Sequence, residues 1–209
     1  MTIVGTVQRS EHWYAARRGM PTCSRFSSIL TAARGGPSKA QDTLINELLA
    51  ESLTPPEQGV IRPPTSEMEH GIILEAEARC CYELEYSKEP VREAGFIVHD
   101  SRLFGGSPDA LVGETGGVEI KCPNAATHIG YLRDGGLPNE YKCQVHGYLI
   151  VTGRAWWDFF SYGRNLPRFI LHVERDEFTD RLAAELLAFC KRYNAIRLTF
   201  GLPPIGVTP

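Results

Sequence analysis

The segment from Gly105 to Pro123 constrains the fold of this chain more than any other stretch. Two short apolar runs, Ala110–Gly113 and Val118–Cys122, flank a turn at 114–117 that contains two glycines. Short apolar runs separated by a glycine-containing turn predict a tight β-hairpin. The charged residues of this hairpin then indicate what kind of site the chain can build.

Three of these charged residues are expected to lie together. Successive side chains of a strand point to opposite faces, so Glu119 and Lys121 share a face while Ile120 points into a core. The hairpin can also bring Asp109, which opens its first strand, beside Glu119. Two carboxylates and an ammonium at one place are the ingredients of a hydrolytic site that uses a divalent metal ion.

The alternative is an exposed hairpin whose charged residues are simply solvated. Two features favour the active-site interpretation: Ser-Pro-Asp at the start of the first strand, where proline fixes the approach of the chain, and Glu-x-Lys inside an apolar run. Charges within an apolar strand are costly unless they are paired or bind a metal ion.

Residues outside the hairpin are candidates for the same site. Glu75 follows three apolar residues of a predicted helix, so it is expected to be partly buried and to help hold metal. The alternative for Glu75 is an ordinary exposed helix carboxylate. Tyr141 and Gln144 lie three residues apart on another predicted helix and share a face. Gln144 could orient a water or a phosphate, or both residues could be ordinary surface groups.

A candidate anion site lies near the N-terminus. Arg17 precedes a predicted helix whose first turn contains Thr22 and Ser24. Free backbone N–H groups at a helix N-terminus, together with an arginine, bind anions, and a phosphate is the obvious occupant if the substrate is DNA. A capped helix with solvated arginines is an equally good reading. Arg34 precedes two glycines in what is either a basic loop tip suited to a DNA groove or a plain turn.

The order of predicted elements favours an α/β (α+β) fold, with a mixed sheet flanked by helices and a helical N-terminal arch. Helices are expected at 10–18, 22–33, 39–53, 65–86, 125–133, 140–151 and 179–200, and strands at 91–99, 154–162 and 168–175 besides the hairpin. Asn139 and Thr179 are the expected caps of the last two helices. We expect one domain over 1–209, with the arch at 10–64, the catalytic core at 65–200 and a loose tail at 201–209.

Composition excludes several classes of protein. No apolar run reaches 18 residues, so no membrane span is expected, and the first residues lack the pattern of a secretory signal. Six cysteines without a CxxC pair suit reduced thiols of a cytoplasmic protein, bacterial or in a phage-infected cell, better than a zinc or iron–sulfur site. A net charge of −3 argues against a surface coated in basic residues, but not against a basic channel.

Several motifs together resemble one family, the phage lambda exonuclease group, which comprises the YqaJ-like viral recombinase nucleases of the PD-(D/E)xK superfamily. The resemblance runs over nearly the whole chain, from about residue 13 to residue 200. Its carriers are Trp13-x3-Arg17 with Gly19, Thr22-x-Ser24, Gly71-x3-Glu75, Ser107-Pro108-Asp109, Glu119-Ile120-Lys121-Cys122-Pro123 and Tyr141-x2-Gln144-Val145. Each motif alone is weak, but their order and spacing are specific. The fold that this resemblance implies has a restriction-endonuclease-like core.

The resemblance also implies roles for the hairpin and its neighbours. Asp109 and Glu119, with the backbone carbonyl of Ile120, would bind Mg²⁺, for which Mn²⁺ can substitute. Lys121 would position or deprotonate the attacking water. Glu75 would hold a second metal ion through water, and Gln144 would orient the site.

Further residues would contact DNA by the same resemblance. Arg17 and Ser24, with Thr22 beside them, would bind the 5′-terminal phosphate. Arg34 would reach the duplex, and Met68 would stand where the family places an apolar wedge. Tyr141 would face the DNA next to the catalytic residues.

The implied activity is a Mg²⁺-dependent 5′→3′ exonuclease that digests one strand of linear double-stranded DNA from 5′-phosphorylated ends to mononucleotides. It would leave a 3′ overhang for a single-strand annealing recombinase, and would work as a homotrimeric ring around DNA. Two alternatives stay open at this point: a structure-specific endonuclease on the same core, and a non-catalytic module that binds DNA ends.

Overall fold

The chain is built on a five-stranded mixed sheet. The computed structural model describes residues 1–33, 35–55 and 66–206, with the backbone alone at 66–73. In spatial order the strands are β2 (Val91–Arg92), β5 (Ala110–Val112), β6 (Gly116–Lys121), β7 (Trp156–Ser161) and β8 (Phe169–Glu174). The central pair, β6 and β7, is parallel and the other neighbours are antiparallel. The predicted mixed sheet and the β5–β6 hairpin are therefore confirmed.

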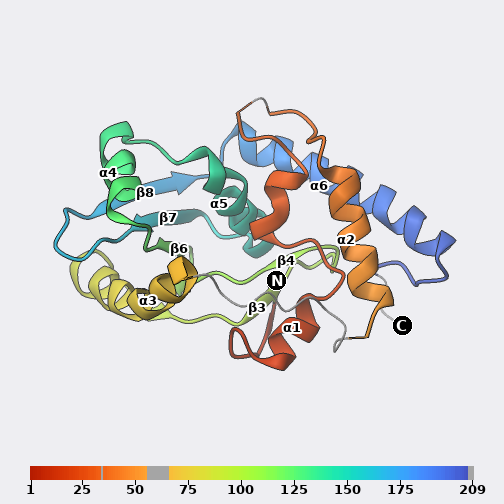
Figure 1. Cartoon of the computed structure of the whole chain (residues 1–209), viewed down its shortest axis with the longest axis horizontal. Helices are drawn as coiled ribbons and strands as arrows, with labels where there is room; N and C mark the ends of the chain where they lie inside the picture. The colour runs from red at the N-terminus through yellow and green to blue at the C-terminus, as the bar shows by residue number, and fades with distance from the viewer. Residues whose placement is uncertain (34, 56–65, 207–209) are drawn as a thin grey trace.

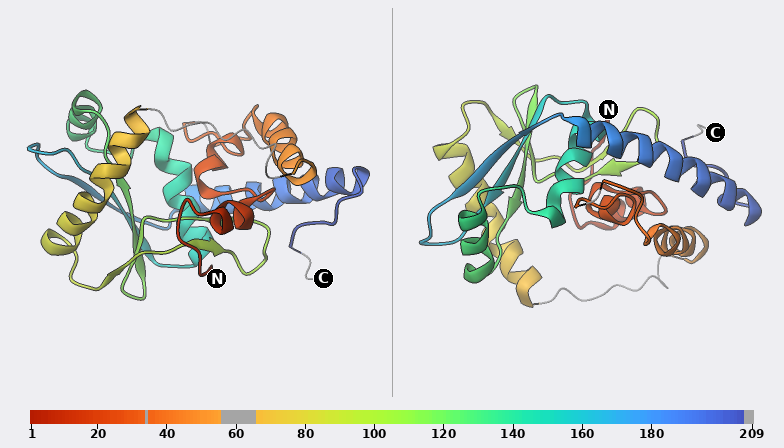
Figure 2. Two further views of the ribbon diagram at one scale, coloured as in Figure 1. Left: turned by 60° about the horizontal axis from the view of Figure 1, so that its bottom comes forward. Right: turned by 90° about the horizontal axis from the view of Figure 1, so that it is seen from above.

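Helices cover both faces of this sheet (Figure 2). Helix α3 (Ser66–Glu85) packs on one face, where its Tyr82 joins a core with Val118, Ile120 and Phe160. Helix α5 (Asn139–Thr152) packs on the other, where a second core contains Trp157. Parallel strands need a long crossover connection, and α4 (Ala125–Asp134) and α5 supply it between β6 and β7. Because Ile120 enters the α3 core, its neighbours in β6 face α5.

The N-terminal elements lie on the far side of α5 from β7 and β8 (Figure 1). A small second sheet has the order β1 (Thr2–Val4), β3 (Phe96–Val98) and β4 (Gly105–Gly106). Around it stand α1 (Glu11–Arg17), the 3₁₀ helix η1 (Cys23–Ser28), α2 (Gln41–Leu53) and the long C-terminal α6 (Glu177–Thr199). Helix α5 contacts both η1 and α6, so it links the two halves of the molecule.

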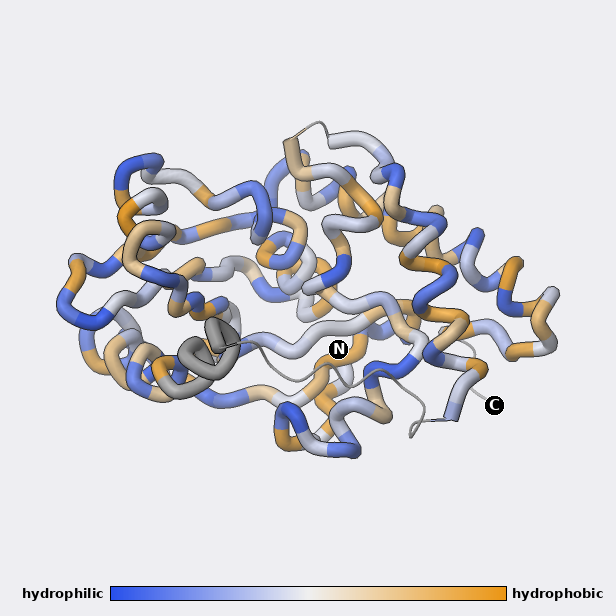
Figure 3. The backbone as a smooth tube through the Cα atoms, viewed as in Figure 1, coloured by the Kyte–Doolittle hydropathy of each residue, from blue (hydrophilic) through white to orange (hydrophobic). Residues whose placement is uncertain are grey.

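Hydropathy follows this packing. Figure 3 shows hydrophobic and hydrophilic residues alternating along α6, as expected for a helix with one buried face. The buried face includes Leu182, Leu186 and Phe189, whereas Leu187 and Leu198 are exposed. No helix among the described residues is both long enough and apolar enough to cross a membrane.

One predicted helix and one predicted helix cap were wrong. The predicted helix at 22–33 is only the short 3₁₀ turn η1, because Ser38 N–H donates to Ile29 C=O at 2.9 Å and Leu30 pairs with Pro37 in an antiparallel bridge. The last helix is capped by Asp176, and Thr179 is instead the third helical residue of a capping box with it.

Other boundaries also differ from the sequence prediction. Asn139 begins α5 rather than capping it, and Pro138 stands at the cap. The predicted strand 91–99 is split into β2 and β3, which belong to different sheets, at a site where a side chain on Gly95 would collide with backbone. The predicted loose tail is tied to α6 as far as Ile205, whose backbone exchanges two hydrogen bonds with the side chain of Asn194. Residues 207–209 lie outside the described part.

Strand β6 of the hairpin contains a glycine that lies against a buried indole. A Cβ on Gly117 would stand 2.3 Å from the Trp157 ring, which is fully buried. Gly117→Ala is therefore expected to lower the free energy of unfolding by about 1–3 kcal/mol, the usual cost of overpacking a core. Urea unfolding followed by tryptophan fluorescence measures this loss.

Gly130 of α4 provides the matched control for this substitution. A Cβ at that position would have no described atom within 4 Å beyond its chain neighbours and the backbone of its own helix. Gly130→Ala should leave stability unchanged or raise it by up to about 1 kcal/mol, because alanine is the better helix former. Equal losses of stability in the two variants would show that the contact with the Trp157 indole is not the reason why residue 117 is glycine.

Candidate active site

The hairpin brings its two carboxylates together where β5 begins and β6 approaches its end. The β5–β6 register pairs Ala110 with Val118, so Asp109 and Glu119 are the next residues on the two strands. Asp109 Oδ2 accepts a hydrogen bond of 2.6 Å from the backbone N–H of Ile120. The backbone of one strand thereby fixes the carboxylate of the other, and the predicted juxtaposition is present.

Glu119 is the most enclosed of the charged groups. It is 1% exposed, and its Oε1 atom forms an ion pair with the Lys121 ammonium and accepts a 2.6 Å hydrogen bond from Gln144 Nε2. Lys121 Nζ in turn lies 5.1 Å from the centre of the Tyr141 ring. Glu119 and Lys121 therefore point, as predicted, to the same face of the sheet, which α5 covers. The two predicted residues of α5, Tyr141 and Gln144, both contact them.

The electrostatics of the hairpin reflect this crowding of negative charge. Burial and then the nearby charge of Glu119 hold the pKa of Asp109 well above its ordinary value. Burial lowers the pKa of Lys121, but the charges of Glu119 and Asp109 outweigh burial and raise that pKa above its ordinary value. The hairpin therefore gathers two carboxyl groups around the single ammonium of Lys121.

The residues present fit a divalent metal ion. Within the described part of the chain, Glu119 Oε2 is buried and has no hydrogen-bond partner. A buried carboxylate oxygen without a donor is costly, and carboxylates are preferred ligands of Mg²⁺. No group of three or more His, Cys, Asp or Glu side chains converges anywhere among the described residues. Asp109 and Glu119 would therefore be completed by backbone, water or substrate oxygens.

Glu75 faces the same region from the opposite side of the sheet. With Asp109 it lines a cavity of about 200 Å³ between α3 and the loop before α1. Its side chain is 21% exposed, in agreement with the predicted partial burial. Its carboxylate is not free, however, because Arg9 Nη2 lies 2.9 Å from Glu75 Oε2.

A second cluster surrounds Arg17. Arg17 Nη1 and Trp13 Nε1 each donate a 2.8 Å hydrogen bond to Ser107 Oγ, and the Arg17 guanidinium lies 4.0 Å from the centre of the Trp13 ring. Burial lowers the pKa of Arg17 from its ordinary value. Thr22 pairs with Gly105 in a short parallel bridge, which places the start of η1 beside Ser107.

The two hydroxyls predicted for this cluster differ in accessibility. Thr22 is 2% exposed whereas Ser24 is exposed, and their oxygens are 3.4 Å apart. Because η1 is a six-residue 3₁₀ helix, its dipole attracts an anion less strongly than the dipole of the longer helix expected at 22–33 would. An anion here would be held by side chains, chiefly those of Arg17, Ser24 and Ser107.

A chain of hydrogen bonds connects the two clusters. Gln144 Nε2, which donates to Glu119, also lies 3.1 Å from the Tyr148 hydroxyl. The Tyr148 hydroxyl donates to the backbone carbonyl of Ser107 at 3.0 Å. Tyr148 is 2% exposed, and its ring stacks on Trp157 at 4.9 Å between centroids. The carboxylate cluster and the Arg17 cluster are therefore parts of one hydrogen-bonded structure.

Tyr148→Phe tests this connection, because it removes one hydroxyl and keeps the ring. The Ser107 carbonyl and Gln144 would each lose a buried partner, so unfolding should become easier by about 1–2 kcal/mol. Thermal unfolding measures that change. Thr152→Val is the comparison for a loss unrelated to the site, because this other buried hydroxyl of α5 donates to the Tyr148 carbonyl and accepts from the backbone N–H of Arg154 after the helix.

The remaining predicted residues fall outside the two clusters or outside the described part. Arg34 is not described, and Met68 belongs to α3 where only the backbone is described. The backbone N–H of Ile120 is occupied by Asp109, while a role for its carbonyl stays a prediction. His128 and His146 are both buried and bonded to neighbouring hydroxyls, as expected for structural histidines.

Sequence reasoning missed four contributors to these clusters. They are Arg9, Trp13, Ser107 and Tyr148. Ser107 was within the Ser-Pro-Asp motif and could have been found from it. Trp13 and Tyr148 each lie four residues from a predicted site residue on the same helix, so helical spacing could have indicated them. Arg9 carries no local signal, because its contact joins residues far apart in the sequence.

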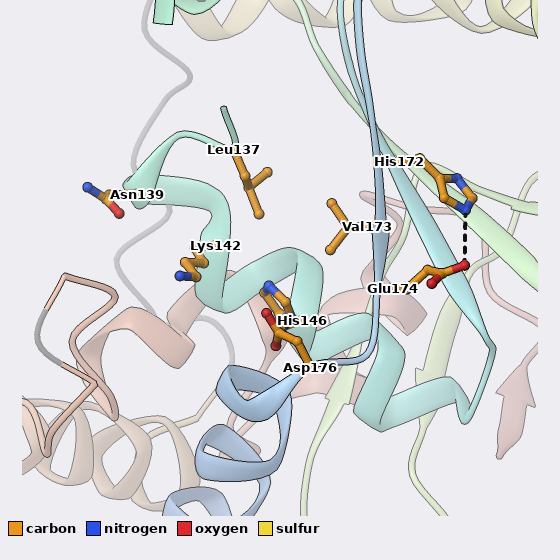
Figure 4. Close-up of a pocket in the computed structure, with 8 residues that line it drawn as sticks. All are labelled: Leu137, Asn139, Lys142, His146, His172, Val173, Glu174 and Asp176. Carbon is orange, nitrogen blue, oxygen red and sulfur yellow. Dashed lines mark ion pairs between the residues drawn. The ribbon is translucent and has the colours of Figure 1, made fainter. Parts of the chain in front are cut away.

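A larger cavity of about 360 Å³ is lined by neither carboxylate of the hairpin (Figure 4). It is bounded by the N-terminal half of α5 and the end of β8, with Lys142, His146, His172, Glu174 and Asp176 around it. Basic and acidic side chains both line it, and His146 Nδ1 lies 2.8 Å from the Thr179 hydroxyl. None of the predicted site residues lines this cavity.

A mixed sheet between α3 and α5, with an acidic hairpin inside it, defines the class: the fold is restriction-endonuclease-like, as in the PD-(D/E)xK superfamily. The sequence profile of the YqaJ-like viral recombinase domain matches residues 12–155, and the chain belongs to this family.

Comparison with solved structures agrees with this assignment. The alkaline exonuclease LHK-Exo from Laribacter hongkongensis is 34% identical, with a TM-score of 0.79 over 92% of this chain and 96% of that one. Its complex with dAMP is 33% identical, with a TM-score of 0.73 over 92% and 98% of the two chains. A phage-related exonuclease from Haemophilus somnus shares the fold at 15% identity and a TM-score of 0.60, over 87% and 96%. No curated protein matches the chain.

Proposed function

We propose that this protein is a Mg²⁺-dependent 5′→3′ exonuclease that digests one strand of linear double-stranded DNA from 5′-phosphorylated ends to mononucleotides. Membership of the YqaJ-like family and similarity to an alkaline exonuclease support a DNA exonuclease role. The observation that carries the metal-dependent chemistry is the buried Glu119 Oε2 atom beside Asp109 and Lys121, which has no hydrogen-bond partner among the described residues.

The chain's own residues divide the reaction between them. Asp109 and Glu119 would hold the metal ion, and Gln144 keeps the Glu119 carboxylate in place through its 2.6 Å hydrogen bond. Bound Mg²⁺ supplies a Lewis acid that lowers the pKa of water and offsets charge on the phosphate. Lys121, on the same face, would position or deprotonate the attacking water and stabilise the negative charge that develops on the phosphate.

The Arg17 cluster would make this nuclease specific for ends. The guanidinium of Arg17 and the hydroxyls of Ser107 and Ser24 are suitable donors to a terminal phosphate. The hydrogen bonds through Tyr148 fix this cluster relative to Glu119. A strand whose 5′-phosphate is held at Arg17 would present a phosphodiester bond to the carboxylates, which favours release of single nucleotides. The related LHK-Exo has been solved with the mononucleotide dAMP.

Digestion of linear and covalently closed circular duplexes separates this proposal from its alternatives. With Mg²⁺, the linear 5′-phosphorylated duplex should be consumed and the circle left intact. Cleavage of the circle would favour a structure-specific endonuclease on the same core. Binding of DNA ends without turnover of either substrate would favour a non-catalytic end-binding module.

We also propose, from the family resemblance, a homotrimeric ring around the duplex and a single-strand annealing recombinase as partner. A ring accommodates the net charge of −3, since only its inner surface needs to be basic. Light scattering of the purified protein would give a trimer mass under this proposal and a monomer or dimer mass against it.

A further inference from the structure

Arg9 stands next to the proposed metal site in an unusual backbone conformation. Its φ is 68°, in the left-handed region that favours glycine. A non-glycine residue persists there only when its surroundings hold it, and such residues gather at functional sites. The strained backbone at this position therefore suggests that the Arg9 side chain has a function.

The loop that carries Arg9 is fastened to the catalytic hairpin. Gln8 Nε2 donates hydrogen bonds to the carbonyl of Ala94 at 2.9 Å and to the carbonyl of Pro108 at 2.8 Å. Pro108 immediately precedes Asp109. The position of Arg9 is thus tied to the position of the carboxylate that would bind metal.

From this loop, the Arg9 side chain contacts α3 along the wall of the cavity of about 200 Å³. Arg9 Nη2 lies 2.9 Å from Glu75 Oε2, and both residues line the cavity together with Asp109. Arg9 is 48% exposed and Glu75 21% exposed. The guanidinium is therefore free to move into water, while the carboxylate stays where it is.

We propose that Arg9 is an internal counter-ion of Glu75, which a divalent cation must displace before Glu75 can serve the metal site. This inference rests on the metal site of the proposed function. A guanidinium and a cation compete for the same carboxylate, since both are positive and cannot share it without repulsion. Arg9 is thus a positioning residue that sets the concentration at which a cation binds near Glu75, in addition to one held by Asp109 and Glu119.

Mn²⁺ binding to the full chain without DNA tests this directly. Arg9→Gly removes the guanidinium and also suits the left-handed backbone, so the melting temperature should not fall. The weaker class of Mn²⁺ sites, followed by the electron paramagnetic resonance signal of free Mn²⁺, should bind roughly tenfold more tightly, as expected when one positive charge beside a divalent ion is removed. In the Arg9→Gly background, Glu75→Gln should abolish this gain.

Arg79 provides a matched control. It lines the same cavity but forms its ion pair with Glu93 instead of Glu75. Arg79→Gln should leave Mn²⁺ affinity within about twofold of wild type, because only a screened charge is lost. A gain as large as that of Arg9→Gly would overturn the inference by showing a general charge effect.

Two further outcomes separate this inference from the proposed function. Equal Mn²⁺ affinity in wild type and Arg9→Gly would overturn the counter-ion role alone. Failure of the wild-type protein to bind Mn²⁺ at millimolar concentration would overturn the metal site and, with it, the inference.

Discussion

Asp109→Asn should abolish Mg²⁺-dependent digestion of linear duplex DNA, with a loss of roughly a thousandfold or about 4 kcal/mol of transition-state stabilisation. Asparagine keeps the shape of the side chain, and its carbonyl oxygen can still accept the hydrogen bond from Ile120 N–H. What it removes is one of the two charges that would hold the metal ion. Initial rates of nucleotide release, wild type against variant, measure the effect.

Stability separates this chemical loss from unfolding. Asp109 and Glu119 repel each other in the protein without metal, and this repulsion helps to raise the pKa of Asp109. Asp109→Asn should therefore melt at the wild-type temperature or above it. Glu114→Gln, an exposed carboxylate at the turn of the same hairpin, should keep full activity. Substantial digestion of DNA by the Asp109→Asn or Lys121→Ala variant would show that the hairpin is not the catalytic site.

Arg17→Ala should remove the preference for a 5′-phosphorylated end. A hydrogen bond to a charged group contributes about 1.5–3 kcal/mol, so kcat/KM on the phosphorylated duplex should fall roughly 10- to 100-fold. Digestion of the 5′-hydroxyl duplex should change much less, because it offers no terminal phosphate to Arg17. Parallel assays on the two duplexes give the ratio.

Arg18→Ala is the control for the loss of a positive charge at the C-terminal end of α1. Arg18 follows Arg17 in the chain, but its guanidinium donates to Thr54 and not to Ser107. Arg18→Ala should retain the phosphate preference. If Arg17→Ala keeps the wild-type ratio of phosphorylated to hydroxyl ends, the Arg17 cluster is not the terminal phosphate site.

The sequence predicted the features that depend on local periodicity. The alternation of Glu119, Ile120 and Lys121 along one strand follows from the two-residue repeat of a strand, so their opposite faces could be inferred without coordinates. The glycine-containing stretch likewise predicted the hairpin, but its turn lies at 113–115 and not at 114–117. Gly116 and Gly117 belong to β6, and the register they set places Asp109 beside Glu119. The same logic gave the face that Tyr141 and Gln144 share on α5.

What the sequence could not predict depends on contacts between distant residues. The Ser107 hydroxyl is shared by Trp13 and Arg17, about ninety positions away, and no spacing rule encodes that. The 3₁₀ turn at 23–28 results from the chain folding back after it, which helix propensity does not reveal. Arg9 is the sharpest case, since a residue typical of solvent stands in a backbone conformation that favours glycine.

The most direct test of the central claim is a strand-resolved digestion of a linear duplex that carries a 5′-phosphate on one strand only and a distinct label within each strand. With wild-type protein and Mg²⁺, the account predicts mononucleotides from the phosphorylated strand, an intact complementary strand, and no release when Mg²⁺ is chelated. Release from the 3′ end, equal loss of both strands, or digestion that persists under chelation would contradict it.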